Sequence, residues 1–108
     1  MGYLEVGKIS DIAEGEIKAY TVQGKDIIVV KYNGKYYAIG SKCTHRGGDL
    51  SKGKLEGKIV TCPLHGAKFD ITNGENISGP KIGLLKIKTN NEPFYEVKIE
   101  GDSIKVNI

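Results

Sequence analysis

The chain has 108 residues, of which 39% are hydrophobic and 27% are charged, and its formal net charge is +3. This composition is too apolar for an intrinsically disordered chain, and the length suits one domain with its own core. No apolar stretch approaches the roughly 20 residues of a transmembrane helix, and the N-terminus lacks a signal-peptide pattern, so we expect a soluble cytoplasmic protein. The basic residues are all lysines except Arg46 and mostly alternate with apolar residues, which does not indicate a nucleic-acid surface.

Short extended segments separated by glycine predict an all-β fold. In chain order we expect strands at residues 3–9, 17–22, 26–32, 35–39, 58–61, 68–71 and 84–89, with at most one helical turn within residues 10–16. Asn33-Gly34 separates two apolar-rich runs and favours a two-residue hairpin turn, because both residues accept positive φ.

The C-terminal segment predicts a second hairpin. Apolar residues alternate with polar ones over residues 95–100 and again over residues 104–108, with Gly101-Asp102 between the two runs. Such alternation is typical of antiparallel strands with one face in the core and one face in water.

Residues 41–80 differ from both flanks, because they hold both cysteines and both histidines of the chain. We therefore predict a single domain, residues 1–108. Residues 1–40 and 81–108 would form an antiparallel β scaffold, and residues 41–80 a loop-rich subdomain carried on it.

The cysteines and histidines form two short boxes. Cys43 is followed by His45 after one residue, and Cys62 is followed by His65 after two residues. Two such loops facing each other would present two thiolates and two imidazoles, which suit either one tetrahedral Zn²⁺ or a [2Fe-2S] cluster. A nucleophilic Cys–His pair would need only one cysteine, so two matched boxes disfavour it.

The residues around the boxes narrow this choice. The segments Cys43-Thr44-His45-Arg46-Gly47-Gly48-Asp49-Leu50 and Cys62-Pro63-Leu64-His65-Gly66-Ala67-Lys68-Phe69-Asp70, with Gly79-Pro80 beyond, resemble the cluster-binding boxes of Rieske proteins. The resemblance implies a Rieske-like antiparallel β-sandwich scaffold with a loop-rich cluster-binding subdomain and one [2Fe-2S] cluster.

The resemblance also assigns roles to individual residues. Cys43 and Cys62 would bind the inner iron, and His45 and His65 the outer, more exposed iron. Gly79-Pro80 resembles the proline loop that covers the cluster in the family. Phe69 is expected to pack beneath the loops, and Asp70 to hold a turn.

Departures from better-known Rieske proteins indicate the function. Gly48 and Leu64 stand where respiratory-chain subunits carry the cysteines of a bracing disulfide, and no membrane-anchor pattern is present. Oxygenase α-subunits need further histidines for a mononuclear iron, and this chain has only His45 and His65. The resemblance implies a free-standing Rieske-type ferredoxin, a one-electron carrier and not an enzyme, between a reductase and a terminal acceptor such as an oxygenase. A zinc-stabilised Cys2His2 interaction module without redox activity is the alternative.

Two further expectations concern the surroundings of the boxes. Lys42, Arg46 and Lys68 flank them, which predicts a positive rim and an acidic docking surface on the partner. Ala67 stands where high-potential members of the family carry a serine that donates to cluster sulfur. The resemblance therefore implies a reduction potential in the lower part of the Rieske range.

Overall fold

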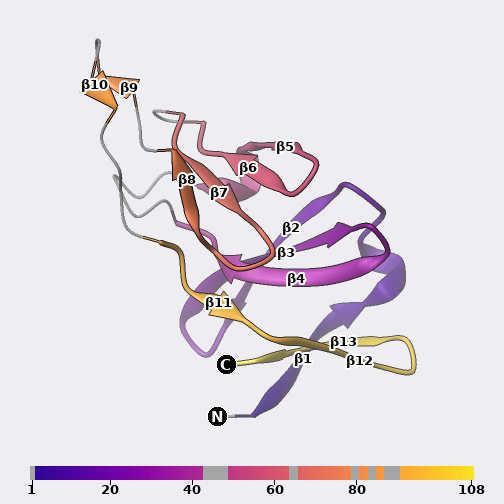
Figure 1. The fold of residues 1–108 in the computed structure, drawn as a ribbon. Helices are drawn as coiled ribbons and strands as arrows, with labels where there is room; N and C mark the ends of the chain where they lie inside the picture. The colour runs from indigo at the N-terminus through magenta and orange to yellow at the C-terminus, as the bar shows by residue number, and fades with distance from the viewer. Residues whose placement is uncertain (1, 43–48, 64–65, 79–80, 83–84, 87–90) are drawn as a thin grey trace.

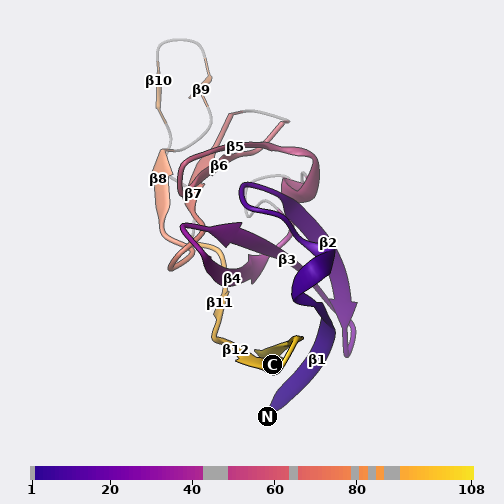
Figure 2. The same cartoon turned by 90° about the vertical axis from the view of Figure 1, so that its right-hand side faces the viewer.

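The computed structural model describes residues 2–42, 49–63, 66–78, 81–82, 85–86 and 91–108, and there the fold is all-β, as the sequence predicts. Three antiparallel sheets form three layers (Figures 1 and 2), with the order β11-β4-β3-β2 in the central sheet. The terminal sheet, β1-β13-β12, covers one face of the central sheet, and the loop-bearing sheet, β5-β6-β7-β8, covers the other. No helix in the described ranges is long and apolar enough to cross a membrane.

The strands are short and follow one another closely along the chain. The central sheet contains β2 (Ile17–Val22), β3 (Lys25–Tyr32), β4 (Lys35–Gly40) and β11 (Phe94–Tyr95). The terminal sheet contains β1 (Tyr3–Lys8), β12 (Val97–Glu100) and β13 (Ser103–Asn107). The loop-bearing sheet contains β5 (Lys54–Glu56), β6 (Ile59–Thr61), β7 (Lys68–Asp70) and β8 (Asn76–Ser78). The remaining elements are the pair β9 (Lys81–Ile82) and β10 (Leu85–Lys86) and the 3-10 turns η1 (Ile9–Asp11) and η2 (Leu50–Lys52).

The middle of β3 is buried on both faces. All four residues from Ile27 to Val30 are 0% exposed. Because side chains alternate along a strand, Ile28 and Val30 pack against the loop-bearing sheet, whereas Ile27 and Val29 pack against the terminal sheet. The run of four aliphatic residues from Ile27 to Val30 is therefore explained by the two apolar cores, one on each face of the central sheet.

Both predicted hairpins are present. The turn between β3 and β4 has positive φ at Asn33 (54°) and Gly34 (78°), and β12 pairs with β13 across the Gly101 turn. The turn expected within residues 10–16 is only the 3-10 turn η1, which starts one residue earlier, at Ile9.

The expectation of one strand over residues 95–100 is wrong. β11 pairs with β4 in the central sheet, whereas β12 pairs with β13 in the terminal sheet. The chain changes sheets at Glu96, whose carbonyl oxygen accepts a hydrogen bond from the Asn107 N–H at 2.9 Å. The alternation of apolar residues continues through the change, so the sequence pattern could not show it. The apolar face of β12 is also incompletely covered, since Ile99 is 41% exposed.

Residues 41–80 contain more regular structure than expected. The strands predicted at residues 58–61 and 68–71 are present as β6 and β7, but β5 and β8 extend them to a four-stranded sheet. Of the strand predicted over residues 84–89, only β10 falls within the described residues. One apolar cluster joins Phe69 and Leu50 to Ile28 of the central sheet. Residues 41–80 therefore pack against the central sheet through a core that is separate from the one beneath the terminal sheet.

The two phenylalanines of the chain provide a matched test of this layering. Phe69 is 0% exposed in the core between the central and loop-bearing sheets, whereas Phe94 is 45% exposed. We expect Phe69→Ala to lower the free energy of unfolding by about 3–5 kcal/mol, because it leaves a cavity. Phe94→Ala should cost less than about 1 kcal/mol. Urea unfolding measures both values, and equal losses would contradict the assignment of the core.

Candidate metal centre

The second box lies in the hairpin between β6 and β7. The Cys62 N–H donates to the Ala67 carbonyl at 2.7 Å, and the Gly66 N–H donates to the Cys62 carbonyl at 3.1 Å. Gly66 has a φ of +78°, a conformation that residues with a side chain rarely adopt. The glycine after the box thus permits the tight turn.

Cys62 is placed at the base of this hairpin loop. Its side chain is 2% exposed, is not part of a disulfide, and lies in the same apolar cluster as Ala67 and Phe69. Ala67 and Phe69 are both 0% exposed, so Phe69 packs beneath the loop as predicted.

The first box is carried by a loop whose two ends meet. Lys42 and Asp49 form an isolated antiparallel bridge, and the Leu50 N–H donates to the Ser41 carbonyl at 2.7 Å. Asp49 also caps η2, because its carboxylate accepts hydrogen bonds from the N–H and the hydroxyl of Ser51 at 2.9 and 2.6 Å. The loop over residues 43–48 therefore begins and ends at one point beside β4.

The bases of the two loops share one apolar cluster. Leu50, at the end of the first box, is 0% exposed and belongs to the cluster that contains Cys62 and Phe69. The three other predicted ligands, Cys43, His45 and His65, lie outside the described residues, as do Arg46, Leu64 and Gly79-Pro80. Of the predicted ligands, the structure therefore describes only Cys62, together with the residues at the base of each loop.

Gly53 is a structural residue that sequence analysis missed. A Cβ atom at this position would collide with the carbonyl oxygen of Thr61, the residue that precedes Cys62. Only glycine lets the end of η2 approach the β6 backbone this closely. The sequence around Gly53 does not distinguish it from the other glycines of the chain, so the sequence alone could not show this role.

Asp70 holds the turn that follows β7, as the sequence predicts. Its Oδ1 accepts hydrogen bonds from the Thr72 N–H at 2.9 Å and from the Thr72 hydroxyl at 2.6 Å, and Lys58 Nζ lies 3.2 Å from Oδ2. Burial on its own would raise the pKa of Asp70, but the bonds from Thr72 and Lys58 outweigh burial and lower it.

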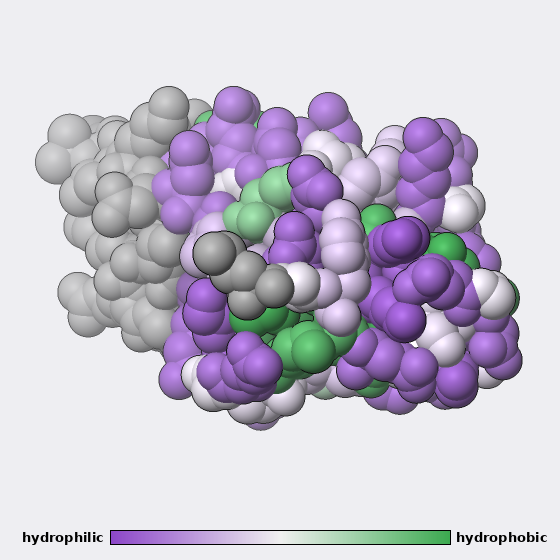
Figure 3. All heavy atoms as spheres, turned by 90° about the horizontal axis from the view of Figure 1, so that it is seen from below, coloured by the Kyte–Doolittle hydropathy of each residue, from purple (hydrophilic) through white to green (hydrophobic). Residues whose placement is uncertain are grey.

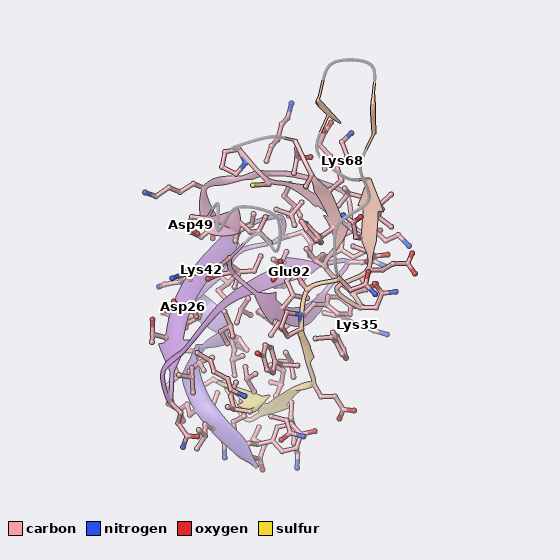
Figure 4. All side chains as sticks on the ribbon, turned by 90° about the vertical axis from the view of Figure 1, so that its left-hand side faces the viewer. Asp26, Lys35, Lys42, Asp49, Lys68 and Glu92 are labelled. Carbon is pink, nitrogen blue, oxygen red and sulfur yellow. The ribbon has the colours of Figure 1, made fainter. Side chains whose placement is uncertain are left out.

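The charge near the first box is mixed. Lys42 Nζ lies 3.6 Å from Asp26 Oδ2, and the Thr21 hydroxyl donates to the other oxygen of Asp26 at 2.7 Å. The pKa of Asp49 is lowered, chiefly by the hydrogen bond from the Ser51 hydroxyl, with smaller contributions from nearby lysines that include Lys42. Figure 4 shows Asp49, Lys42 and Asp26 following one another along this side of the molecule. Lys42 therefore adds little net positive charge.

The side of the second box has a different character. Lys68 and Pro63 are exposed, and Ile77 on the neighbouring strand β8 is 48% exposed (Figure 4 labels Lys68). No described carboxylate lies within ion-pair distance of Lys68. Sequence analysis missed Ile77, although an isoleucine between two polar residues of a short strand is a weak sign of an outward side chain.

The described part of the site fits an iron–sulfur centre. Cys62 is not in a disulfide and lies at the base of a loop that backbone hydrogen bonds hold, a placement that suits a sulfur ligand of a metal centre. The chain's two cysteines and two histidines match, in number and kind, the ligands of a [2Fe-2S] centre in which two histidines replace two cysteines on one iron.

Comparisons with known proteins identify the family of the chain. The model of the Rieske [2Fe-2S] domain matches residues 2–89. The chain is 34% identical over 106 residues to the ferredoxin component of the naphthalene 1,2-dioxygenase system of Pseudomonas putida, covering 98% of this chain and 95% of that protein. It is 37% identical over 100 residues to the ferredoxin component of the naphthalene 1,2-dioxygenase/salicylate 5-hydroxylase systems of a Ralstonia species, covering 92% and 88%.

A solved structure shows the same fold. A chain in the complex of reduced oxygenase and oxidised ferredoxin of carbazole 1,9a-dioxygenase matches with a TM-score of 0.83 and 28% identity, covering 96% of this chain and 100% of that chain. The chain therefore belongs to the Rieske [2Fe-2S] domain family. The comparisons confirm the expected class: an electron carrier with one [2Fe-2S] cluster per chain, and not itself an enzyme.

The pH dependence of stability tests whether the charge of Asp70 stabilises the turn that follows β7. A carboxyl group whose folded pKa is lowered stabilises the protein above its unfolded pKa, and this stabilisation is lost as pH falls through the folded pKa. We expect Asp70→Asn to be less stable than the wild type near neutral pH, and the difference to shrink as pH falls below 3.8, the ordinary pKa of an aspartate. Urea unfolding over this pH range measures the difference.

Asp102→Asn is the control for this series, because the Asp102 side chain is 75% exposed and its nearest lysine nitrogen lies at 3.8 Å. It should change stability little at any pH. A destabilisation by Asp70→Asn that persists unchanged into acid would show that the lost interaction does not depend on the charge of Asp70.

Proposed function

We propose that this chain is the ferredoxin component of a multicomponent oxygenase system, which accepts one electron from a reductase and passes it to a terminal oxygenase. The observation that carries the proposal is the meeting of the two loop bases, at Leu50 and Cys62, in one apolar cluster, which suits a centre shared by both loops. The ferredoxin components of dioxygenase systems, which match nearly the whole chain, support it. We also propose that the protein acts in the cytoplasm.

The proposed ligands are Cys43 and Cys62 on one iron and His45 and His65 on the other. When bound, the cluster takes up and releases one electron. The protein's part is to fix the ligands: the hydrogen bonds between Cys62, Gly66 and Ala67 set the second loop, and the bridge at Lys42 and Asp49 sets the first.

We also propose the division into a scaffold of residues 1–40 and 81–108 and a cluster-binding subdomain of residues 41–80.

The proposed partner surface lies beside the second box. Exposed Ile77 and Pro63 supply apolar contacts, and Lys68 supplies positive charge that would match an acidic surface on a partner. Lys42 contributes little to this match, because Asp26 and Asp49 lie next to it.

Replacement of Cys62 tests the ligand assignment. The purified protein should contain two irons and two sulfides per chain and be reduced reversibly by one electron. Cys62→Ser should lose the cluster, because the thiolate is both a ligand and an anchor of the loop. Thr61→Ser, one residue away in β6, is the matched control and should retain the iron and sulfide content and the absorption spectrum.

Two results would contradict this assignment. Full cluster content in Cys62→Ser would remove this residue from the ligand set. A colourless wild-type protein that holds one zinc would support the Cys2His2 interaction module and exclude electron transfer.

Small charged oxidants test the charge of the proposed partner surface without a protein partner. The second-order rate of oxidation of the reduced protein by ferricyanide, an anion, should fall as salt increases, and the rate with a cationic cobalt(III) complex should rise. Lys68→Glu should slow the reaction with ferricyanide several-fold, while Lys98→Glu on the terminal sheet should leave it unchanged. Equal effects of the two variants would show that only net charge matters.

A further inference from the structure

Two asparagines of the chain, Asn33 and Asn73, are each followed by glycine. Such pairs are chemically labile. The glycine nitrogen gives up its proton and forms a bond to the side-chain Cγ of asparagine, and the amide nitrogen leaves as ammonia. Water then opens the resulting succinimide to aspartate or isoaspartate. Because the attacking nitrogen must lose its proton, the group that accepts a hydrogen bond from the glycine N–H affects how fast each pair reacts.

One carboxylate holds both N–H groups of the exposed Asn33-Gly34 turn. The N–H of Asn33 donates to Oε2 of Glu14 at 2.5 Å, and the N–H of Gly34 donates to Oε1 at 3.0 Å. The hydrogen bond from Gly34, followed by the one from Asn33, lowers the pKa of Glu14. The carboxyl group is therefore charged in neutral and alkaline solution, where deamidation is fastest.

The backbone around Glu14 places the carboxylate at this turn. The Gly15 N–H donates to the Lys31 carbonyl at 2.8 Å, and the Lys31 N–H donates to the Glu16 carbonyl at 3.4 Å. Gly15 has a φ of +80°, a conformation that favours glycine, and it lets the chain turn beside β3. Glu14 thus belongs to a segment that is bound to β3 two residues before the Asn33-Gly34 turn.

The backbone alone protects the second pair. The Gly74 N–H donates to the Asp70 carbonyl at 2.7 Å, and Gly74 is buried. A Cβ atom at Gly74 would collide with the carbonyl oxygen of Glu92, so this turn is also closely packed. Because no side chain holds the Gly74 N–H, Asn73 provides an internal reference for Asn33.

We propose that Asn33 is a deamidation site that the Glu14 carboxylate keeps closed. The carboxylate occupies the N–H of Gly34, and its negative charge opposes the loss of that proton. Asn33 is exposed, and no described residue forms a hydrogen bond with its side-chain amide. Protection of this pair therefore depends on one side chain, which lies 20 residues from Gly34 in the sequence.

Modification of Asn33 would act on the central sheet. Isoaspartate would lengthen the two-residue turn by one backbone atom, and aspartate would add a second carboxylate beside Glu14. This turn pairs Tyr32 with Lys35, and the register decides which face of the sheet each residue of β3 occupies. The turn lies at the end of β4 away from the boxes (Figure 1), and hydrophilic residues predominate at the right-hand end of the molecule in Figure 3. The site is therefore open to water and separate from the proposed metal centre.

The test measures deamidation at the two asparagines separately. The holoprotein is incubated in mildly alkaline buffer, and the tryptic peptides of residues 32–35 and 69–81 are analysed by mass spectrometry. Asn33 should react at least about tenfold more slowly in the folded wild type than in urea-unfolded protein, because its glycine N–H bonds a charged group. Glu14→Ala should remove most of this protection, and Glu14→Gln should remove part of it, since an amide oxygen accepts a hydrogen bond but has no charge. Asn73 should react at the wild-type rate in both variants.

Glu75→Gln is the matched control, because Glu75 follows the other Asn-Gly pair but does not hold its glycine N–H. It should leave the rates at both asparagines unchanged. Hydrogen exchange of the ¹⁵N-labelled holoprotein gives a second readout: Glu14→Ala should accelerate exchange at Gly34 and not at Gly74.

Three results would overturn the proposal. The first is a wild-type Asn33 that reacts as fast in the folded protein as in urea. The second is an unchanged rate at Asn33 in Glu14→Ala. The third is an equal increase at Asn33 and Asn73 in Glu14→Ala, because the variant would then have loosened the whole fold.

Discussion

Burial of both faces of the central sheet is the constraint on which the rest of the structure depends. Residues Ile27 to Val30 of β3 are fully buried because they contribute alternately to two cores. An antiparallel sheet commonly leaves one face in water, and here a second layer must cover it. The loop-bearing sheet and Leu50 provide this layer, so the segment that carries the two boxes is also a structural part of the fold.

In this arrangement, the segments that carry the proposed ligands follow the ends of strands. The first box follows β4, and the second box joins β6 to β7, so both loops leave the same core between two sheets. Their bases are fixed by backbone hydrogen bonds at Ser41, Leu50, Cys62 and Ala67, and by the close approach that Gly53 allows. Because the fold already fixes the bases of both loops, the entropic cost of forming the centre is lower.

The sequence predicted those features that depend on local patterns. The Asn33-Gly34 turn follows from two adjacent residues, and the buried Phe69 and the turn at Asp70 follow from the resemblance of the second box to the Rieske motif. Features that depend on distant packing were missed: β5 and β8 are too short for a clear alternation, and the change of sheet at Glu96 leaves the alternation intact. The expectation for Lys42 was incomplete, because Asp26 reaches it from another strand.

The central claim is that both histidines of the chain bind one iron of a [2Fe-2S] cluster, and labelling can test it directly. The chain contains only His45 and His65, so ¹⁵N-histidine marks these two residues and no others. Pulsed electron paramagnetic resonance of the reduced protein should show couplings to two labelled nitrogens that are bound to the cluster. No coupling to labelled nitrogen, or coupling to only one, would contradict the ligand set and with it the assignment of this site.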